Sequence, residues 1–538
     1  MTGGQRRFPA LVLLGWLAAC GGGGGGTAPG DGGDPATSPG EPSTPPHPEL
    51  SFAPGQLTET YGAGASVALG VKATLNVPLP GEIHAIIVDA AGVLVPEISI
   101  QPDLAWAGSY LASFRTNPSL AQGRHQGRLE VHLCQDKDCA TEHAGSPWYL
   151  PYDFQILPNT NLTPLTRWAQ APDWETFQGN AAHSGYVPVT LDASRFSPRW
   201  YWTAPENTGG VSPLVVANGL IYLSGSGQYS SGTPPRLFAL RESDSGKQWQ
   251  FDLSVSDVNP PAVSGGKVYV STESGYNNAF MWSFDATTGA QLSKVAFNSQ
   301  GLSYFVPTIE GGVVYANGGY NGGMYAFGFA DGAQRWFRAL PGQFAAWTPA
   351  VDAKYVYACT GGLFSALDKS TGAVAFTLGQ APPGGGGSTC VAPVIGSNGS
   401  VVVAGGGTLM SFNPASRVKN WTLDGPYGNN PVIANGVIYV TNTSPFRLEA
   451  RSEATGALLW SWAPAGPSEW TGYDSGGRSS VLVTDNLVFV STTSRVYAID
   501  LATHAPVWSY WEPGSLALSA NGVLYVQGGK TLGAVNLK

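Results

Sequence analysis

The sequence predicts an all-β protein, in which an immunoglobulin-like β-sandwich over residues 50–158 precedes an eight-bladed β-propeller over residues 199–538. Three observations support this fold class. The 538 residues include 72 Gly and 41 Pro beside 17 Trp, 22 Tyr and 21 Phe, which favours short strands and tight turns over long helices. Alternating apolar and polar residues fill the first region. A strand-and-turn pattern then recurs eight times at a period of about 43 residues, which is typical of propeller blades.

Residues 1–19 are interpreted as a lipoprotein signal peptide. Arg6 and Arg7 supply a positive start, and the apolar stretch after them is only ten residues long, too short to span a bilayer. It ends in Leu-Ala-Ala-Cys, which resembles the lipobox of bacterial lipoproteins. The resemblance implies cleavage before Cys20 and acylation of that residue, and an ordinary signal peptide followed by a chance Cys is the alternative. We therefore expect a chain held by lipid in the bacterial cell envelope.

Residues 20–49 are expected to form a flexible tether. Between positions 21 and 49 the chain has 10 Gly and 7 Pro, so apolar burial cannot offset the entropy lost on ordering. Gly21, rather than Asp, follows the acylated position. By resemblance to enterobacterial sorting, this residue favours the outer membrane.

The five cysteines fit an exported protein. With Cys20 assigned to lipid, four cysteines remain, which an oxidising compartment would let pair as two disulfides. Cys134 and Cys139 enclose a short polar loop. Cys359 ends a strand of the fourth repeat, and Cys390 precedes a strand of the fifth on the same expected face. A metal site is the alternative for the first pair, but no second pair at metal spacing accompanies it.

The sandwich prediction rests on five stretches with period-2 alternation, separated by Gly and Pro turns. They cover Ser66–Ala73, Glu82–Val88, Tyr110–Arg115, Gly127–Cys134 and Tyr152–Leu157. Four histidines, His84, His125, His132 and His143, also lie in this region. Histidines scattered over strands and loops explain them better than a metal site, so we expect no metal.

The repeats follow a lead-in at residues 159–198. Each unit has a strand after a turn of small residues, with one equivalent position in every copy: Tyr222, Tyr269, Tyr315, Tyr357, Val402, Tyr439, Phe489 and Tyr525. A strand precedes it, and another strand, a turn and often Trp follow, which makes four strands per unit. Arg199–Trp202 resembles these Trp strands but lies before the first unit. We therefore expect it to complete the eighth blade and remove the open edge.

A tyrosine strand followed by Ala-x-Asp-x-x-Thr-Gly and Trp resembles the PQQ-like, or quinoprotein alcohol dehydrogenase-like, repeat family. The lead-in Trp174–Tyr186 also resembles the start of such propellers, so the resemblance covers about residues 174–538. It implies that six tryptophans pack between neighbouring blades: Trp200, Trp249, Trp336, Trp421, Trp460 and Trp508. With its lipobox, the chain is most similar to the non-enzymatic BamB-like lipoproteins of this family.

Catalytic signatures are absent from the sequence. The family's dehydrogenases hold PQQ beside adjacent cysteines, a Ca²⁺ site and a catalytic Asp, whereas this chain has no adjacent cysteines. From residue 174 onward it has only His183 and His504, and it lacks the G-x-S-x-G elbow, the P-loop and the EF-hand loop. We therefore expect no catalytic residues and no PQQ or other cofactor. A dehydrogenase with a divergent site stays the alternative.

A binding site is expected on the propeller face where the segments entering the inner strands converge. These segments carry aromatic residues and one arginine: Tyr304, Phe305, Phe344, Trp347, Tyr427, Trp470, Tyr473 and Arg478. Aromatic rings with a few donors are typical of protein and sugar sites, whereas rings that plug the channel or pack between blades are the alternative. The formal net charge is -9 with no basic block, which argues against nucleic acid. We expect a monomeric scaffold for an envelope protein or glycan; a carbohydrate-binding or adhesive surface protein is a further alternative.

Overall fold

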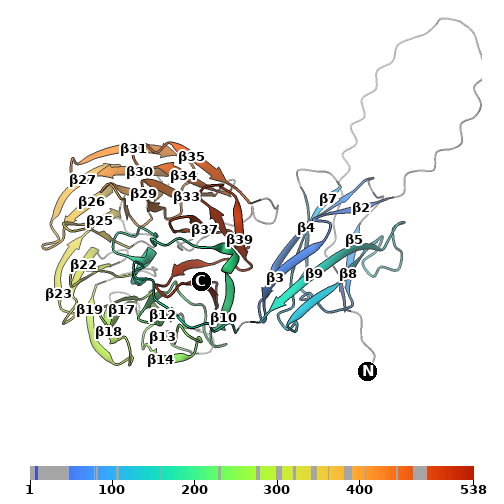
Figure 1. Ribbon diagram of the computed structural model, residues 1–538, viewed down its shortest axis with the longest axis horizontal. Coiled ribbons are helices and arrows are strands. Elements are labelled where there is room, and N and C mark those ends of the chain that lie inside the picture. The colour runs from blue at the N-terminus through green and yellow to red at the C-terminus, as the bar shows by residue number, and fades with distance from the viewer. Residues whose placement is uncertain are drawn as a thin grey trace, which may run out of the picture. The chain divides into compact units, whose positions relative to one another are not determined.

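The structure is a computed structural model (Figure 1). It describes residues 6–9, 48–77, 79, 83–103, 108–158, 160–227, 232–273, 279–298, 306–318, 323–340, 348–360, 363–380, 391–405, 407–443, 446–464 and 481–538. The chain divides into two compact units, residues 1–157 and 158–538.

The described residues of the first unit form two β-sheets, with strand orders β1-β5-β8-β9-β3 and β2-β4-β7-β6. All neighbours are antiparallel except β3 and β9, which are parallel. The strands are β1 (Arg6–Pro9), β2 (Leu50–Ala53), β3 (Leu57–Gly62), β4 (Ala68–Leu75), β5 (His84–Asp89), β6 (Ser99–Pro102), β7 (Ser109–Arg115), β8 (Gly123–Cys134) and β9 (Trp148–Leu157).

Along the strands of the first unit, alternate side chains are buried. On β9 the side chains of Leu150, Tyr152, Phe154 and Ile156 are buried, and the residues between them are more exposed. This pattern follows from the period of two along a strand, which sends alternate side chains to one face. The predicted disulfide is present and joins Cys134, the last residue of β8, to Cys139.

The described residues of the second unit form eight antiparallel sheets, and Figure 1 shows them following one another around a ring. The strands of the first four sheets are β11 (Val215–Ala217), β12 (Leu220–Gly225), β13 (Arg236–Arg241) and β14 (Lys247–Asp252); β15 (Asp257–Val258), β16 (Ala262–Ser264), β17 (Lys267–Glu273), β18 (Ala279–Asp285) and β19 (Gln291–Phe297); β20 (Thr308–Glu310), β21 (Val313–Asn317), β22 (Gly323–Gly328) and β23 (Gln334–Ala339); and β24 (Ala350–Val351), β25 (Tyr355–Thr360), β26 (Leu363–Asp368) and β27 (Val374–Gln380).

The remaining four sheets continue the ring. Their strands are β28 (Val394–Ile395), β29 (Val401–Gly405), β30 (Thr408–Asn413) and β31 (Val418–Asp424); β32 (Val432–Ala434), β33 (Val437–Thr443), β34 (Phe446–Ser452) and β35 (Leu458–Trp462); β36 (Val481–Val483), β37 (Leu487–Ser491), β38 (Val496–Asp500) and β39 (Pro506–Tyr510); and β40 (Ser515–Leu518), β41 (Val523–Gln527), β42 (Thr531–Asn536) and β10 (Ser197–Thr203). Two short 3₁₀ helices, η1 (Phe177–Gly179) and η2 (Ala193–Arg195), precede β10.

Strand β10 closes the ring. It pairs antiparallel with β42, so the last sheet combines one strand from the start of the unit with three from its end. This is the closure that the sequence predicts from Arg199–Trp202. A shared sheet removes the free edges that the first and last strands would otherwise expose.

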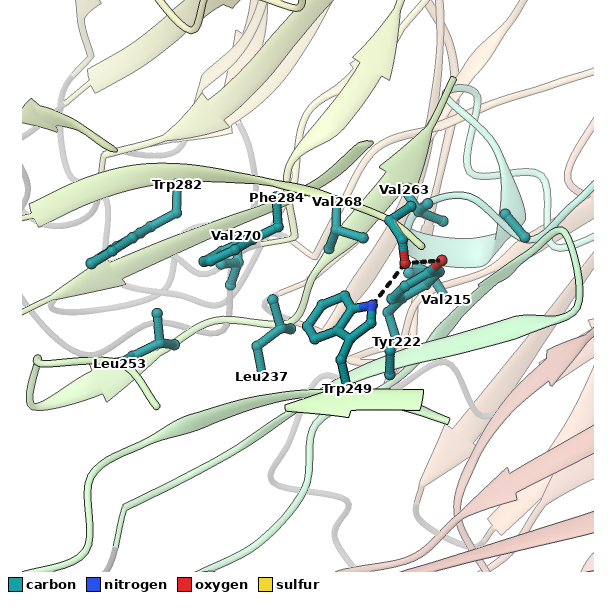
Figure 2. Close-up of a cluster of buried hydrophobic side chains, with 13 residues drawn as sticks. Val215, Tyr222, Leu237, Trp249, Leu253, Val263, Val268, Val270, Trp282 and Phe284 are labelled. Carbon is teal, nitrogen blue, oxygen red and sulfur yellow. Dashed lines mark hydrogen bonds between the residues drawn. The ribbon is translucent and has the colours of Figure 1, made fainter. Parts of the chain in front are cut away.

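Tryptophans join neighbouring sheets, as the family resemblance implies. Figure 2 shows Trp249 of β14 against Phe284 of the second sheet, and its indole Nε1 donates to the carbonyl of Ala286 at 2.8 Å. The Tyr222 hydroxyl donates to the same carbonyl at 3.0 Å. The indoles of Trp200, Trp336 and Trp421 make the equivalent bond to the turn of the following sheet. Each such indole thus buries apolar area and also satisfies a turn carbonyl.

Candidate functional site

The propeller axis is occupied by residues 174–187, here called the axial segment. It runs past the innermost strand of one sheet after another and exchanges backbone hydrogen bonds with them. Its partners are the backbone groups of Val216, Val263, Val351, Ile395, Ile433 and Val483. At the third sheet, the Thr176 hydroxyl donates to the carbonyl of Pro307 at 2.7 Å. At the eighth sheet, the helix η1 contacts β40. The segment therefore bridges all eight sheets.

Gly185 allows the axial segment to approach the sixth sheet. Its φ is +62°, and a Cβ atom at this position would lie 1.9 Å from Cγ1 of Val432. A side chain would therefore meet both backbone strain and a direct clash. The Gly185 carbonyl also accepts from the amide of Val483 on the seventh sheet at 2.9 Å, so this residue lies against two neighbouring sheets.

His183 forms a buried polar contact at the axis. Its ring is fully buried, with Nδ1 2.9 Å from the carbonyl of Pro393 and Nε2 3.2 Å from the hydroxyl of Thr308. A carbonyl only accepts, so Nδ1 carries the proton and Nε2 is left to accept from Thr308. Burial lowers the pKa of His183 to about 4. The ring is therefore neutral near pH 7 and acts as a structural hydrogen-bonding group.

Most residues of the predicted binding rim lie outside the described residues. These are Tyr304, Phe305, Phe344, Trp347, Trp470, Tyr473 and Arg478. Cys20 and Cys390 lie outside them too. Cys359 is disulfide-bonded, and its pairing with Cys390 stays a prediction.

Tyr427 is the rim residue that the structure describes, and it is packed rather than open to solvent. Only 3% of its surface is exposed, and it lies in a hydrophobic cluster between the fifth and sixth sheets. Its hydroxyl donates to Oε2 of Glu449 at 2.8 Å. In this structure Tyr427 thus follows the alternative that the sequence left open, in which a rim aromatic packs between blades.

Glu449 is a buried carboxylate that sequence reasoning missed. Arg447 lies 2.8 Å from its Oε1 and Arg451 lies 2.7 Å from its Oε2. Burial alone would raise the pKa of Glu449, but the bonds from Tyr427 and Arg451 and the two guanidinium charges hold that pKa below its usual value. The signal was present in the sequence, because alternate residues of a strand share one face. Arg447, Glu449 and Arg451 follow that spacing on β34.

The described residues around the axis do not fit PQQ. This quinone carries several carboxylates, which need cations or many donors to replace water. The described groups that bind the axial segment include backbone amides and carbonyls, neutral hydroxyls and the carboxylate of Asp485, which accepts from Tyr186 and would repel an anion, and His183 is itself neutral. Within the described part of the chain, no group of three His, Cys, Asp or Glu side chains is placed to hold a metal ion. We therefore derive no reaction step through this cofactor.

The structure also bears on membrane association. Among the described residues, none belongs to a helix with the length and apolar character needed to cross a bilayer.

Comparison with known proteins identifies the repeat. The family model described as "Outer membrane protein assembly factor BamB" matches residues 194–292 and 279–510. BamB from Moraxella catarrhalis is 17% identical, covering 63% of this chain and 99% of its own, at a TM-score of 0.49. A quinohemoprotein alcohol dehydrogenase from Comamonas testosteroni is 16% identical, covering 68% and 81%, at a TM-score of 0.52. A europium-containing methanol dehydrogenase is 13% identical, and the match covers 66% of this chain and 90% of the dehydrogenase at a TM-score of 0.50.

No curated protein matches the sequence. At identities this low, the two dehydrogenase structures bear on the fold alone, a PQQ-like β-propeller. The family-model matches together span residues 194–510, more than half of the chain. This chain therefore belongs to the PQQ-like repeat family whose model is described as outer membrane protein assembly factor BamB.

Proposed function

We propose that this protein is a lipid-anchored, non-catalytic binding scaffold of the bacterial envelope. In this proposal, acylated Cys20 holds the chain at the outer membrane, and residues 20–49 act as a tether. The first unit is an immunoglobulin-like module, and the eight sheets are the eight blades of a propeller whose loop face binds a partner. The description of the matching family, an assembly factor of the outer membrane, makes an envelope protein the favoured partner.

The axial segment is the observation that carries this proposal. A chain segment that binds all eight sheets fills the place where a central ligand would otherwise sit, and it ties the blades into one body. The loops around a rigid body can then present a preformed surface, which lowers the entropy lost on binding. This arrangement suits recognition of a macromolecule across the face.

Site-specific capture tests the proposal. Native membranes are treated with a crosslinker, and partners are identified for the wild-type chain and for Trp347→Ala/Trp470→Ala. We expect the double variant to lose one specific envelope protein at least tenfold. Phe337→Ala is the matched control, because this exposed aromatic lies on β23, the last strand of its sheet. Equal capture by a folded double variant would contradict the rim site, and recovery of glycan alone would favour the carbohydrate-binding alternative.

A quinoprotein dehydrogenase is the second candidate, since the Comamonas testosteroni enzyme has the same propeller fold, although a shared fold does not by itself give an activity. Such an enzyme would bind PQQ together with Ca²⁺ and reduce an artificial dye when alcohols are supplied. We expect no PQQ-dependent dye reduction above background. A PQQ-dependent rate would overturn the non-catalytic proposal.

A further inference from the structure

One sheet of the first unit is bordered by a strand that the proposed processing removes from the mature protein. Strand β1 pairs antiparallel with β5, so that Arg6 lies opposite Asp89 and Phe8 lies opposite Ile87. It is the outermost strand of its sheet. Cleavage before Cys20, which is part of the proposed function, takes away residues 6–9 and leaves β5 as the edge strand.

Strand β5 lacks the features that protect edge strands. Native edge strands are often short or carry Lys or Pro, which discourages pairing with another chain. Both edge strands of the other sheet fit this rule, since β2 and β6 have four residues each and β6 ends in Pro102. The six residues of β5 are His-Ala-Ile-Ile-Val-Asp, of which five are buried and none is Lys, Arg or Pro. Its composition is that of a strand with a neighbour on both sides.

Asp89, the last residue of β5, has a buried oxygen that lacks a donor. Only 1% of this residue is exposed. Its Oδ2 accepts from the amide of Leu94 at 2.8 Å, whereas its Oδ1 has no hydrogen-bond partner among the described residues. A buried carboxylate oxygen is costly to leave without a donor. A cationic side chain opposite Asp89 would supply both the donor and the compensating charge.

The face of β5 that carries Asp89 also sets the chemistry two positions away. Ile87 lies on the same face, because alternate residues of a strand point the same way, and it is buried. Residues paired across two antiparallel strands share a face. A strand added to β5 is therefore best matched when a cationic residue lies opposite Asp89 and an apolar residue lies opposite Ile87.

We propose that the β5 edge of the mature protein binds an extended segment of another envelope protein as an added antiparallel strand. In such strand addition, the backbone groups give affinity and alternate side chains give specificity. This site depends on the processing at Cys20 in the proposed function. Residues 6–9 read Arg-Arg-Phe-Pro and have the expected pattern, with Arg6 opposite Asp89 and Phe8 opposite Ile87. The precursor thus covers the edge with its own segment.

Charge favours another protein over this chain as the occupant. Residues 20–49, which remain after processing, contain no Lys or Arg. They cannot place a permanent cation opposite Asp89, and their many Gly and Pro residues disfavour a strand. Strand β5 of a second copy also has no Lys or Arg to offer.

Peptide binding to protein purified from membranes tests the edge. The probe is a fluorescein-labelled peptide with the sequence of residues 4–11, followed by fluorescence anisotropy. We expect one peptide bound per processed chain, and binding weaker by roughly tenfold or more when the peptide carries Arg6→Ala. Arg7→Ala is the matched control, because position 7 lies opposite Val88 and so on the other face. Its binding should be nearly unchanged, and equal weakening by both changes would overturn the proposal.

Processing is read separately, by mass spectrometry of the N-terminal peptide of the same protein. A chain that begins at Cys20 and binds no peptide overturns the strand-addition site and leaves the proposed anchoring intact. A chain that retains residues 1–19 contradicts the anchoring, and with it the opening of the β5 edge.

Asp89→Asn tests the charged contact from the side of the protein. Asparagine keeps an acceptor for the amide of Leu94 but removes the charge. We expect it to weaken binding of the unchanged peptide by roughly tenfold and to leave binding of the Arg6→Ala peptide unaltered. Hydrogen exchange should show new protection of the β5 amides when peptide is bound. Protection elsewhere without protection of β5 would overturn the site.

The natural occupant is identified by placing a photo-crosslinking amino acid at Ile86 in cells. This residue lies on β5 and is only partly buried. We expect the crosslinked peptide to come from another envelope protein and to carry Lys or Arg two positions from an apolar residue. A crosslink to a second copy of this chain, to residues 20–49, or to a peptide without that pattern would overturn the assignment of the occupant.

Discussion

Nη1 of Arg199 donates to Oδ1 of Asn536 at 2.9 Å, which joins the first strand of the second unit to its last. The same guanidinium donates to the carbonyls of Thr163, Glu242 and Ser243. Its side chain is almost wholly buried, with 1% of the residue exposed. One planar group with five donors therefore connects the lead-in, the first sheet and the closing sheet.

Arg199→Ala should weaken the closure of the propeller. Removing the guanidinium breaks its bonds to four acceptors, of which the Glu242 carbonyl keeps the bond from Trp200, and we expect a loss of about 3 kcal/mol in the free energy of unfolding. Arg199→Lys should recover only part of this loss, because one ammonium group cannot reach all four acceptors. Urea unfolding measures the change, and Arg195→Ala is the exposed control. A loss below about 1 kcal/mol would mean that β10 and β42 hold the closure without Arg199.

Gly185→Ala should loosen the axial segment. The added Cβ meets Val432 and also requires a positive φ, so we expect a loss of roughly 2 kcal/mol or more. Gly428→Ala is the control, because a Cβ at that position has no neighbour within 4 Å and the backbone is not left-handed. Thermal unfolding compares the two variants. Equal Tm values would show that the segment can shift away from the sixth sheet at little cost.

His183 should make stability fall in mild acid. Its pKa is about 4 when folded and about 6.5 when unfolded, so between these values the unfolded state binds more protons. The free energy of unfolding therefore decreases as pH falls from 6.5 to 4, by about 3 kcal/mol from this group. Urea unfolding of the wild type and of His183→Asn across this range isolates the effect. Parallel pH profiles would mean that His183 takes up its proton over the same pH range in the folded and unfolded states.

Much of the fold could be predicted because its signals are local. Period-2 strands and a turn motif repeated eight times indicate the sheets, and the aromatic Arg199–Trp202 stretch indicates the closure. The path of residues 174–187 could not be predicted, since Gln178 meets Pro431 and His183 meets Pro393 only after the ring has closed. Each such contact joins residues more than 200 positions apart.

The candidate site was harder to predict for a similar reason. A tyrosine before an inner strand gives the same sequence signal whether its ring lies on the rim or between sheets. The deciding partner of Tyr427 is Glu449, which lies 22 residues later on β34. Neither residue's burial can be inferred from its immediate neighbours in sequence. The paired spacing of Arg447, Glu449 and Arg451 was the one local indication of a charged cluster.

The coupling between Tyr427 and Glu449 can be measured with a double-mutant cycle. Tyr427→Phe removes the 2.8 Å bond to a buried carboxylate, and we expect a loss of about 1 to 3 kcal/mol in the free energy of unfolding. Glu449→Gln should cost a similar amount, because it leaves the guanidinium of Arg451 without its charged partner. The double variant should lose less than the sum of the two single variants, by at least about 1 kcal/mol.

The pH dependence of the same variants identifies the charge on Glu449. Its pKa is lower in the folded protein than its ordinary value, so its contribution to stability is present above the unfolded pKa. That contribution is lost as pH falls through the folded pKa. Tyr427→Phe should shrink this acid-dependent loss, because the bond from the hydroxyl is one of the causes of the low pKa. Additive losses with identical acid profiles would show that the hydroxyl and the carboxylate act independently, and that packing alone holds Tyr427 between the fifth and sixth sheets.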